Sequence, residues 1–377
     1  MSAAHTLLLI RHGEIGLKSH AVRNRMERAL TDRIEQALLY RDVEAIVRRS
    51  PARHYVEAQD LDAAAEAVRH VFGITTFSRA MQTGADLPDI LAAAADYAER
   101  WWPPGAVRFA IRPRRTGGHG YTSQDIGIQA GSAVYRRMEA RGVPVQVDLS
   151  EPEFAVHIEV RNQEAFLYHE KLPGPGGLPL GTQGRMVLPL DSGDAAVAAY
   201  LMMRRGALVL PYYLPQAVSG DAETEGRLHA LHETLRAWNG PAELKPWYVD
   251  ATEAAAVRGD PLPDDGVPLQ RLALTCGAKF AKRAKAQAIV TGESMRSPWA
   301  RRLPETQGDL GVPVLRPLMG LSRPVIDDFR ELLGLARLGG PRATGTERTY
   351  TAGGRRDAPR REDDPVGTEE VRGWDPY

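Results

Sequence analysis

Apolar and polar positions in the first 80 residues predict a small mixed domain. Residues 6–12 form an apolar, β-rich run, and residues 21–40 place Met26, Leu30, Ile34 and Leu38 at helical spacing with charged residues between them. The rest of the pattern predicts strands at 43–49 and 54–58, a helix at 61–71 and a strand at 75–79. The order β-α-β-β-α-β predicts a ferredoxin-like domain over residues 1–75.

A second α/β unit is predicted over residues 76–172. An alanine-rich helix at 87–101 ends at Pro103-Pro104-Gly105, and a second helix is expected at 123–141. Strands are expected at 107–112, 145–148, 155–161 and 165–171. Residues 173–184 are so rich in glycine and proline that they should form a linker or a binding loop.

Strands and helices alternate after residue 185, which predicts a parallel, doubly wound sheet over residues 185–338. Ligands of such sheets bind at the carboxyl ends of the strands. The expected strands are 185–190, 207–213, 247–249, 288–290 and 314–316, and the expected helices are 195–205, 224–238, 269–286 and 325–333. Residues 339–377 contain few apolar positions and should be disordered.

Composition adds three exclusions. Lys plus Arg and Asp plus Glu both number 48, so any surface for nucleic acid must be local. Cys276 is the single cysteine, which excludes an internal disulfide and a Cys/His zinc cluster, and its helical apolar surroundings favour inert packing. With no apolar stretch of about 18 residues, we expect a cytoplasmic protein that spans no membrane, and we predict no metal site of its own.

Arg112, Arg114 and Arg115 precede a glycine-rich segment that contains His119. Arginine side chains suit RNA phosphates, so we favour an RNA contact over a solvated strand end. The helix over residues 21–33 also carries arginines, but its acidic residues make paired surface charges an equal alternative. His12, within an Arg-His-Gly motif like that of histidine phosphatases, is interpreted as structural.

Several motifs together resemble the ThiI-type tRNA sulfurtransferases, the tRNA 4-thiouridine synthetases. They lie at residues 11–18, 109–119, 121–126, 147–152, 170–184, 197–206, 289–294 and 313–318. The resemblance implies an N-terminal ferredoxin-like domain, a THUMP domain and a PP-loop domain. It also implies that the first two bind tRNA and that the third uses ATP and Mg²⁺ to adenylate the uridine at position 8 before a sulfur donor displaces AMP. The implied tRNA contacts are Arg112, Arg114, Arg115, His119, Lys171, Gln183 and Arg185.

The ATP loop departs from the family pattern, Ser-Gly-Gly-x-Asp-Ser. Here it reads Leu190-Asp-Ser-Gly-Asp-Ala195, and Asp194 alone keeps its position, as the candidate catalytic residue. Glycines that tolerate positive φ are missing and Asp191 adds a negative charge, so the phosphate site should be weakened. The residues that the resemblance places at this degenerate ATP site are Leu190, Ser192, Gly193, Asp194, Arg271, Gly292 and Arg301.

Two hypotheses follow. The chain is an ATP-dependent thiolation enzyme with a reworked loop and a separate sulfur donor, because no cysteine follows Cys276, or it is a tRNA-binding protein whose ATP domain is a silent scaffold. For Asp194, a helix N-cap and a retained catalytic carboxylate are alternatives. A homodimer is left open.

Overall fold

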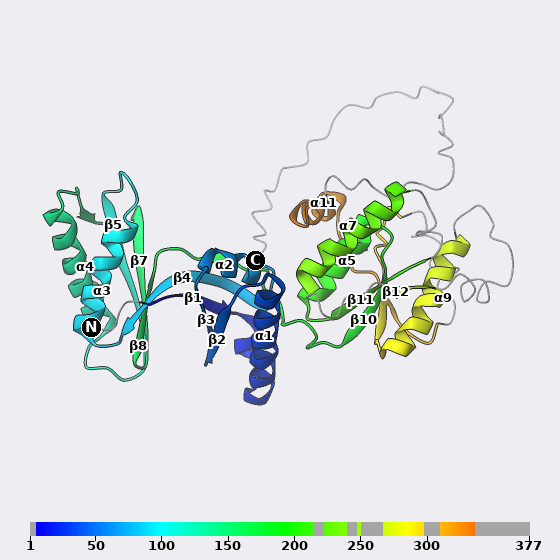
Figure 1. Cartoon of the computed structure of the whole chain (residues 1–377), viewed down its shortest axis with the longest axis horizontal. Helices are drawn as coiled ribbons and strands as arrows, with labels where there is room; N and C mark the ends of the chain where they lie inside the picture. Colours follow the sequence, from blue (N-terminus) through cyan, green and yellow to red (C-terminus); the bar gives the residue numbers. More distant parts are fainter. Residues whose placement is uncertain (1–4, 215–221, 240–246, 250–266, 298–309, 336–377) are drawn as a thin grey trace, which may run out of the picture. The chain divides into compact units, whose positions relative to one another are not determined.

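The computed structural model describes residues 5–214, 222–239, 247–249, 267–297 and 310–335 (Figure 1). Two predictions lie outside the described residues: the disordered tail at 339–377, and Arg301.

The N-terminal domain is ferredoxin-like, as predicted. Its elements are β1 (His5–His12), the short helix η1 (Glu14–Leu17), α1 (His20–Tyr40), β2 (Ala45–Ser50), β3 (Arg53–Ala58), α2 (Leu61–Val68) and β4 (Ile74–Gly84). The strand order is β2-β3-β1-β4, with antiparallel neighbours. Leu8 and Ile10 pack with α1 and α2, while Leu7 and Leu9 join a separate cluster with Tyr55. This alternation is the two-residue period of a strand.

The second domain continues the same sheet. Its elements are α3 (Leu87–Trp101), β5 (Arg108–Thr116), α4 (Ser123–Ala140), β6 (Gln146–Val147), β7 (Phe154–Arg161), β8 (Glu164–Tyr168) and β9 (Leu172–Pro173). The 11-residue strand β4 pairs with β1 along most of its length and with β8 at its far end, so one nine-stranded sheet serves both domains.

Local signals explain where two of these elements start or stop. Thr122 and Asp125 form a reciprocal capping box that begins α4. The expected strand at 145–148 shrinks to two residues, because the Asp148 carboxylate accepts hydrogen bonds from the amides of Ser150 and Glu151 and so turns the chain.

The C-terminal domain is the predicted doubly wound parallel sheet. Its elements are β10 (Arg185–Pro189), α5 (Gly193–Arg204), β11 (Leu208–Tyr213), α7 (Ala222–Asn239), β12 (Trp247–Tyr248), α9 (Val267–Ala284), β13 (Ala288–Val290), β14 (Val314–Leu315) and α11 (Arg323–Leu332). The strands are all parallel and lie in the order β12-β11-β10-β13-β14. From β10 the chain adds β11 and β12 on one side and then β13 and β14 on the other, so the switch point of the sheet lies between β10 and β13. A sheet of this kind binds ligands where its order reverses, beyond the strands' carboxyl ends.

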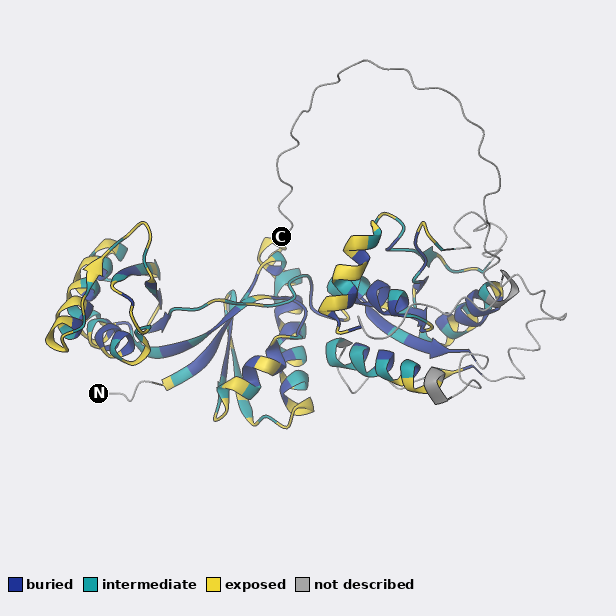
Figure 2. Cartoon of the chain, turned by 90° about the horizontal axis from the view of Figure 1, so that it is seen from above, coloured by how far each residue is buried: buried dark blue, intermediate teal, exposed yellow. Residues whose placement is uncertain are grey.

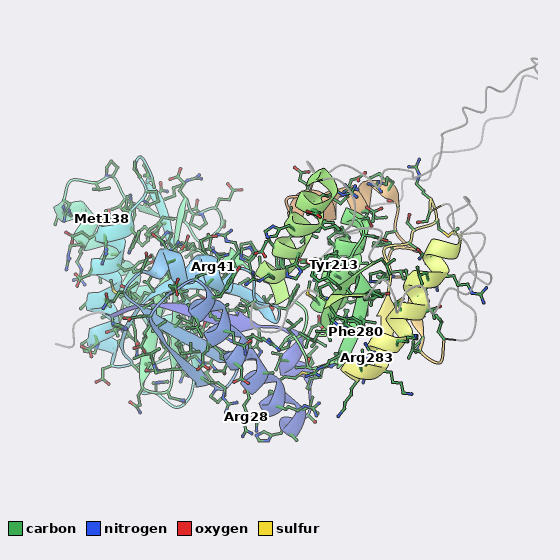
Figure 3. The ribbon with its side chains drawn as sticks, turned by 45° about the vertical axis from the view of Figure 1, so that its right-hand side comes forward. Arg28, Arg41, Met138, Tyr213, Phe280 and Arg283 are labelled. Atoms are coloured by element: carbon green, nitrogen blue, oxygen red, sulfur yellow. The ribbon has the colours of Figure 1, made fainter. Side chains whose placement is uncertain are left out.

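The C-terminal domain has two hydrophobic cores, in which helices pack against the strands of the sheet. The strands are dark blue in Figure 2, which marks them as buried. Figure 3 labels Tyr213 on β11 and Phe280 on α9, which belong to the two cores of the domain. Cys276 is buried in the second of these cores, as its packing role predicts. Among the helices that the structure describes, none combines the length and apolarity needed to cross a membrane.

Candidate RNA groove and nucleotide loop

A groove of about 1320 Å³ opens in the second domain along β5. β6 pairs with β5 only at Arg108 and Phe109, so beyond these residues that edge of β5 has no partner strand among the described residues, and β5 and α4 line the groove together. Gly127 and Gly131 stand on the groove side of α4. A Cβ atom on Gly127 would lie 3.6 Å from Pro113 and one on Gly131 would lie 3.9 Å from Ile111, which are ordinary contact distances, so α4 lies close to β5 at these two glycines.

Positive charge is concentrated in this groove. Arg112, Arg114, His157 and Lys171 line it, and Arg11 lies close to Lys171 and His157. Burial and then the repulsion from Lys171, Arg11, Arg112 and Arg114 lower the pKa of His157 to about 4. Burial, Arg11 and Arg114 also lower the pKa of Lys171. With a pKa of about 4 His157 is neutral at pH 7, so the positive charge of the groove comes from Arg112, Arg114 and Lys171, with Arg11 beside them.

Apolar side chains share the groove with these cations. Ile128, Tyr135, Val147 and Leu149 line it and are exposed, which is uncommon for large apolar residues gathered in one place. An apolar floor beside cations is the combination that nucleic-acid bases and phosphates require.

The other residues predicted to contact tRNA do not line this groove. Arg115, near the end of β5, donates a hydrogen bond to the Gly117 carbonyl at 2.7 Å, and in the loop that follows His119 Nε2 lies 2.6 Å from the Asn162 carbonyl. Gln183 and Arg185 lie in the third domain, at the amino end of β10. Arg28 on α1, labelled in Figure 3, is exposed on another helix.

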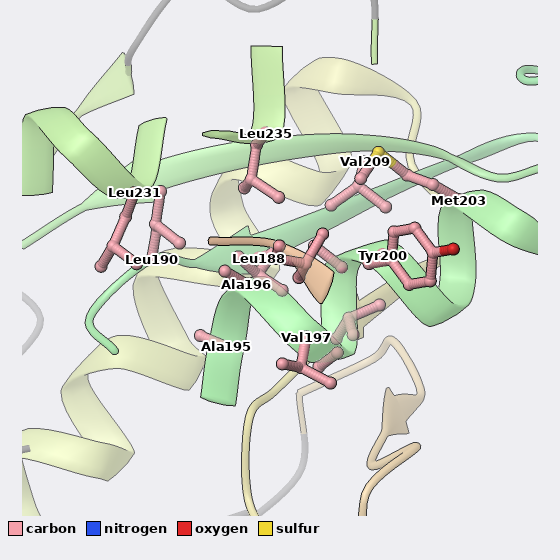
Figure 4. Close-up of a cluster of buried hydrophobic side chains, with 14 of the residues drawn as sticks. Leu188, Leu190, Ala195, Ala196, Val197, Tyr200, Met203, Val209, Leu231 and Leu235 are labelled. Atoms are coloured by element: carbon pink, nitrogen blue, oxygen red, sulfur yellow. The ribbon is translucent and has the colours of Figure 1, made fainter. Parts of the chain in front are cut away.

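The nucleotide loop is a direct strand-to-helix turn. Ser192 is the N-cap of α5, because its hydroxyl accepts a hydrogen bond from the Ala195 amide at 3.2 Å. The alternative of Asp194 as N-cap is therefore wrong, since α5 has already begun at Gly193. Leu190 is 1% exposed and packs in the core beside Leu188 and Leu231 (Figure 4).

Asp194 is held by two arginines of α11. Arg323 lies 3.0 Å from one carboxylate oxygen and Arg330 lies 3.2 Å from the other. Both arginines were missed in the sequence, where the helix was expected only from residue 325; in the observed α11 their spacing of seven residues places them on one face.

Glu293 is a second carboxylate at the switch point: it follows β13, as Asp194 follows β10. It is buried, accepts a hydrogen bond from Gln270 at 2.6 Å and lies 2.5 Å from Arg316. Gln270 therefore holds the Glu293 carboxylate, while its neighbour Arg271 is exposed. Gly292 touches the first turn of α5, because a Cβ there would lie 2.4 Å from the Ala195 amide nitrogen.

These residues do not fit the triphosphate of ATP in the way that a glycine-rich loop does. No residue from Leu190 to Ala195 has the positive φ that a nest of converging amides needs. Asp191 is exposed at the surface and its carboxylate accepts a hydrogen bond from the Ser192 hydroxyl, but partial desolvation by the protein around it raises its pKa, with Glu293 acting in the same direction. In addition, the described residues contain no cluster of three His, Cys, Asp or Glu side chains able to hold a metal ion.

The fold defines an α/β protein in which a ferredoxin-like domain shares its sheet with a second α/β domain, and a doubly wound, nucleotide-type sheet domain follows. Family comparisons agree with each part: a ThiI ferredoxin-like domain matches residues 7–78, a THUMP domain residues 84–170, and the family described as thiamine biosynthesis protein (ThiI) residues 181–335. The chain belongs to the ThiI-type tRNA sulfurtransferase family.

Relatives match along nearly the whole chain. A probable tRNA sulfurtransferase of Methanobrevibacter smithii is 33% identical over 88% of this chain and 87% of its own length. One of Halobacterium salinarum is 34% identical, over 83% and 80%. Among solved structures, PH1313 of Pyrococcus horikoshii has a TM-score of 0.69 at 25% identity, covering 88% of this chain and 100% of its own. A 4-thiouridine synthetase–RNA complex with bound ATP shares the fold, with a TM-score of 0.73 at 21% identity over 89% and 86%.

Proposed function

We propose that this protein binds tRNA through the groove of its second domain. The observation that supports this best is the group of cations formed by Arg112, Arg114, Lys171 and Arg11, beside a neutral His157, in a chain with no net charge. Phosphates relieve the mutual repulsion of these cations, and the release of counterions from RNA adds to the binding free energy.

The groove favours a single-stranded segment over a duplex. Tyr135, Val147 and Leu149 offer apolar surface to unstacked bases, while Arg114 and Lys171 stand beside them for the phosphates. A base-paired segment hides its base faces and could use the cations alone.

The test measures tRNA affinity by fluorescence anisotropy at several salt concentrations. We expect Arg114→Ala and Lys171→Ala each to weaken binding and to reduce the slope of log K against log [salt] by about 0.7–0.9. Arg112 is left unchanged, because it also donates a hydrogen bond to the Leu149 carbonyl and its loss could disturb the fold.

Arg69→Ala is the matched control. Arg69 lies on another surface and forms an exposed pair with Glu66, so its loss should leave affinity and slope unchanged. Groove variants that bind tRNA as tightly as the parent, with the same slope, would remove the groove from the interface.

ATP-dependent tRNA thiolation is a second candidate function. It is favoured by the position of Gly292 against α5 at the switch point, where sheets of this order bind nucleotides. The loop chemistry opposes it, so we propose that the C-terminal domain is a scaffold. Titration calorimetry with ATP and Mg²⁺, and an assay for 4-thiouridine in tRNA from a strain carrying only this protein, distinguish the two; thiolation would overturn the scaffold.

A further inference from the structure

We infer that Asp194 anchors α11 to the first turn of α5 and is not a ligand of a nucleotide or its cation. The inference deepens the proposed scaffold role of the C-terminal domain. It concerns the one residue of the family's nucleotide loop that this chain retains.

The ion pairs occupy both oxygens of Asp194. Arg323 approaches Oδ2 at 3.0 Å and Arg330 approaches Oδ1 at 3.2 Å, so a metal cation bound to the carboxylate would have to compete with two arginines. The Asp194 side chain is 13% exposed and that of Arg330 is 8% exposed, which makes the second pair a buried one. Separating it would leave two charges poorly solvated.

The position of Arg330 is itself unusual. A Cβ on Gly193 would lie 3.3 Å from the Arg330 guanidinium, so this cation is pressed against the amino end of α5. The helix macrodipole makes that end partly positive and repels a cation. Asp194, in the first helical turn, supplies the negative charge that offsets this repulsion, which accounts for an aspartate being needed here without any nucleotide.

Other contacts of α11 agree with an anchoring role. Ile326 is buried in the same core as Val197 and Tyr200 of α5. Phe329 packs on Tyr200, with 5.9 Å between the two ring centroids. The apolar contacts give α11 its surface against α5, and the Asp194 pairs fix its position along that surface.

The test is a double-mutant cycle on the full chain, with Asp194→Asn, Arg330→Met and the combined variant followed by thermal unfolding of the C-terminal domain. Each single variant should lower the midpoint by roughly 5 °C or more, because each leaves a partner poorly paired. The combined variant should unfold at a midpoint no lower than that of the less stable single variant. Asp327→Asn, which breaks only an exposed pair with Arg323, is the control and should shift the midpoint by no more than about 2 °C.

Two results would overturn the inference. One is strict additivity of the two substitutions. The other is binding of ATP and Mg²⁺ to the parent, measured by calorimetry, that Asp194→Asn abolishes while the protein stays folded by circular dichroism. Binding of tRNA is measured separately and should be the same in all these variants, so failure of the anchor and failure of the RNA groove are distinguishable.

Discussion

Leu190 shows how one side chain can decide what a loop does. The family's loop has a serine at this position, and a serine hydroxyl can face a ligand. Here an apolar side chain turns inward and joins the core between β10 and α7. Because the chain enters α5 directly after Ser192, the turn is held by core packing and a cap, without converging amides.

We predict that Leu190→Ala lowers the free energy of unfolding of the C-terminal domain by about 2–5 kcal/mol. The change deletes a side chain that is 1% exposed and leaves a cavity. Urea denaturation followed by circular dichroism measures the effect. Leu17→Ala is the control: Leu17 is 88% exposed and its loss should matter by less than about 0.5 kcal/mol. Equal effects for the two variants would mean that Leu190 does not belong to the core.

Single residues also show where sequence reasoning stopped. The departures at Leu190 and Asp191 were visible in the chain, and so was the cation run at Arg112 and Arg114. The partners of Asp194 and Glu293 were not, because Arg330 and Gln270 are respectively 136 and 23 residues away from them. Hydrogen bonds and ion pairs at such separations depend on tertiary packing, which no local pattern encodes.

At the scale of elements, periodicity predicted the helices and most strands, since each buries one face. The range 87–101 coincides with α3. What periodicity could not supply is the length of β4, expected at 75–79 but running from Ile74 to Gly84, because its far end gains its partner from β8, about 80 residues later. The border of the first two domains therefore lies within a shared strand.

The contact between the β13 loop and α5 gives a prediction at the same scale. We expect Gly292→Ala to lower the stability of the C-terminal domain by about 1–3 kcal/mol, because the added methyl would lie 2.4 Å from backbone and force the loop away from α5. Gly226→Ala on α7 is the matched control. It points a methyl into open space and should stabilise the domain by about 0.5–1 kcal/mol. Chemical denaturation of both variants checks the contrast, and a harmless Gly292→Ala would contradict the contact.

At the scale of the whole molecule, opposite charges balance in total and also pair at particular sites. The net charge is zero, yet Glu159 on β7 is surrounded by three arginines: Arg53 at 2.9 Å, Arg161 at 3.1 Å and Arg11 at 3.7 Å. Arg53 and Arg11 come from the first domain and Glu159 from the second. One carboxylate thus connects the two halves of the shared sheet, beside the cations of the groove.

Glu159→Gln should therefore destabilise the first two domains together, by about 3–5 kcal/mol at pH 7, since it leaves three partly buried arginines facing one another. Burial tends to raise the pKa of Glu159, but Arg53 and Arg11 outweigh it and the pKa is lowered. A carboxylate with a depressed pKa stabilises the fold above the pKa of the unfolded chain, and this stabilisation is lost as the pH falls through the folded value. The difference between parent and variant should accordingly shrink below about pH 4.3. Urea denaturation of parent and variant at pH 7 and pH 3.5 measures this difference in stability. The control is Glu66→Gln, because Glu66 is an exposed partner of Arg69. A difference that stays constant with pH would show that the Glu159 charge does not hold the first two domains together.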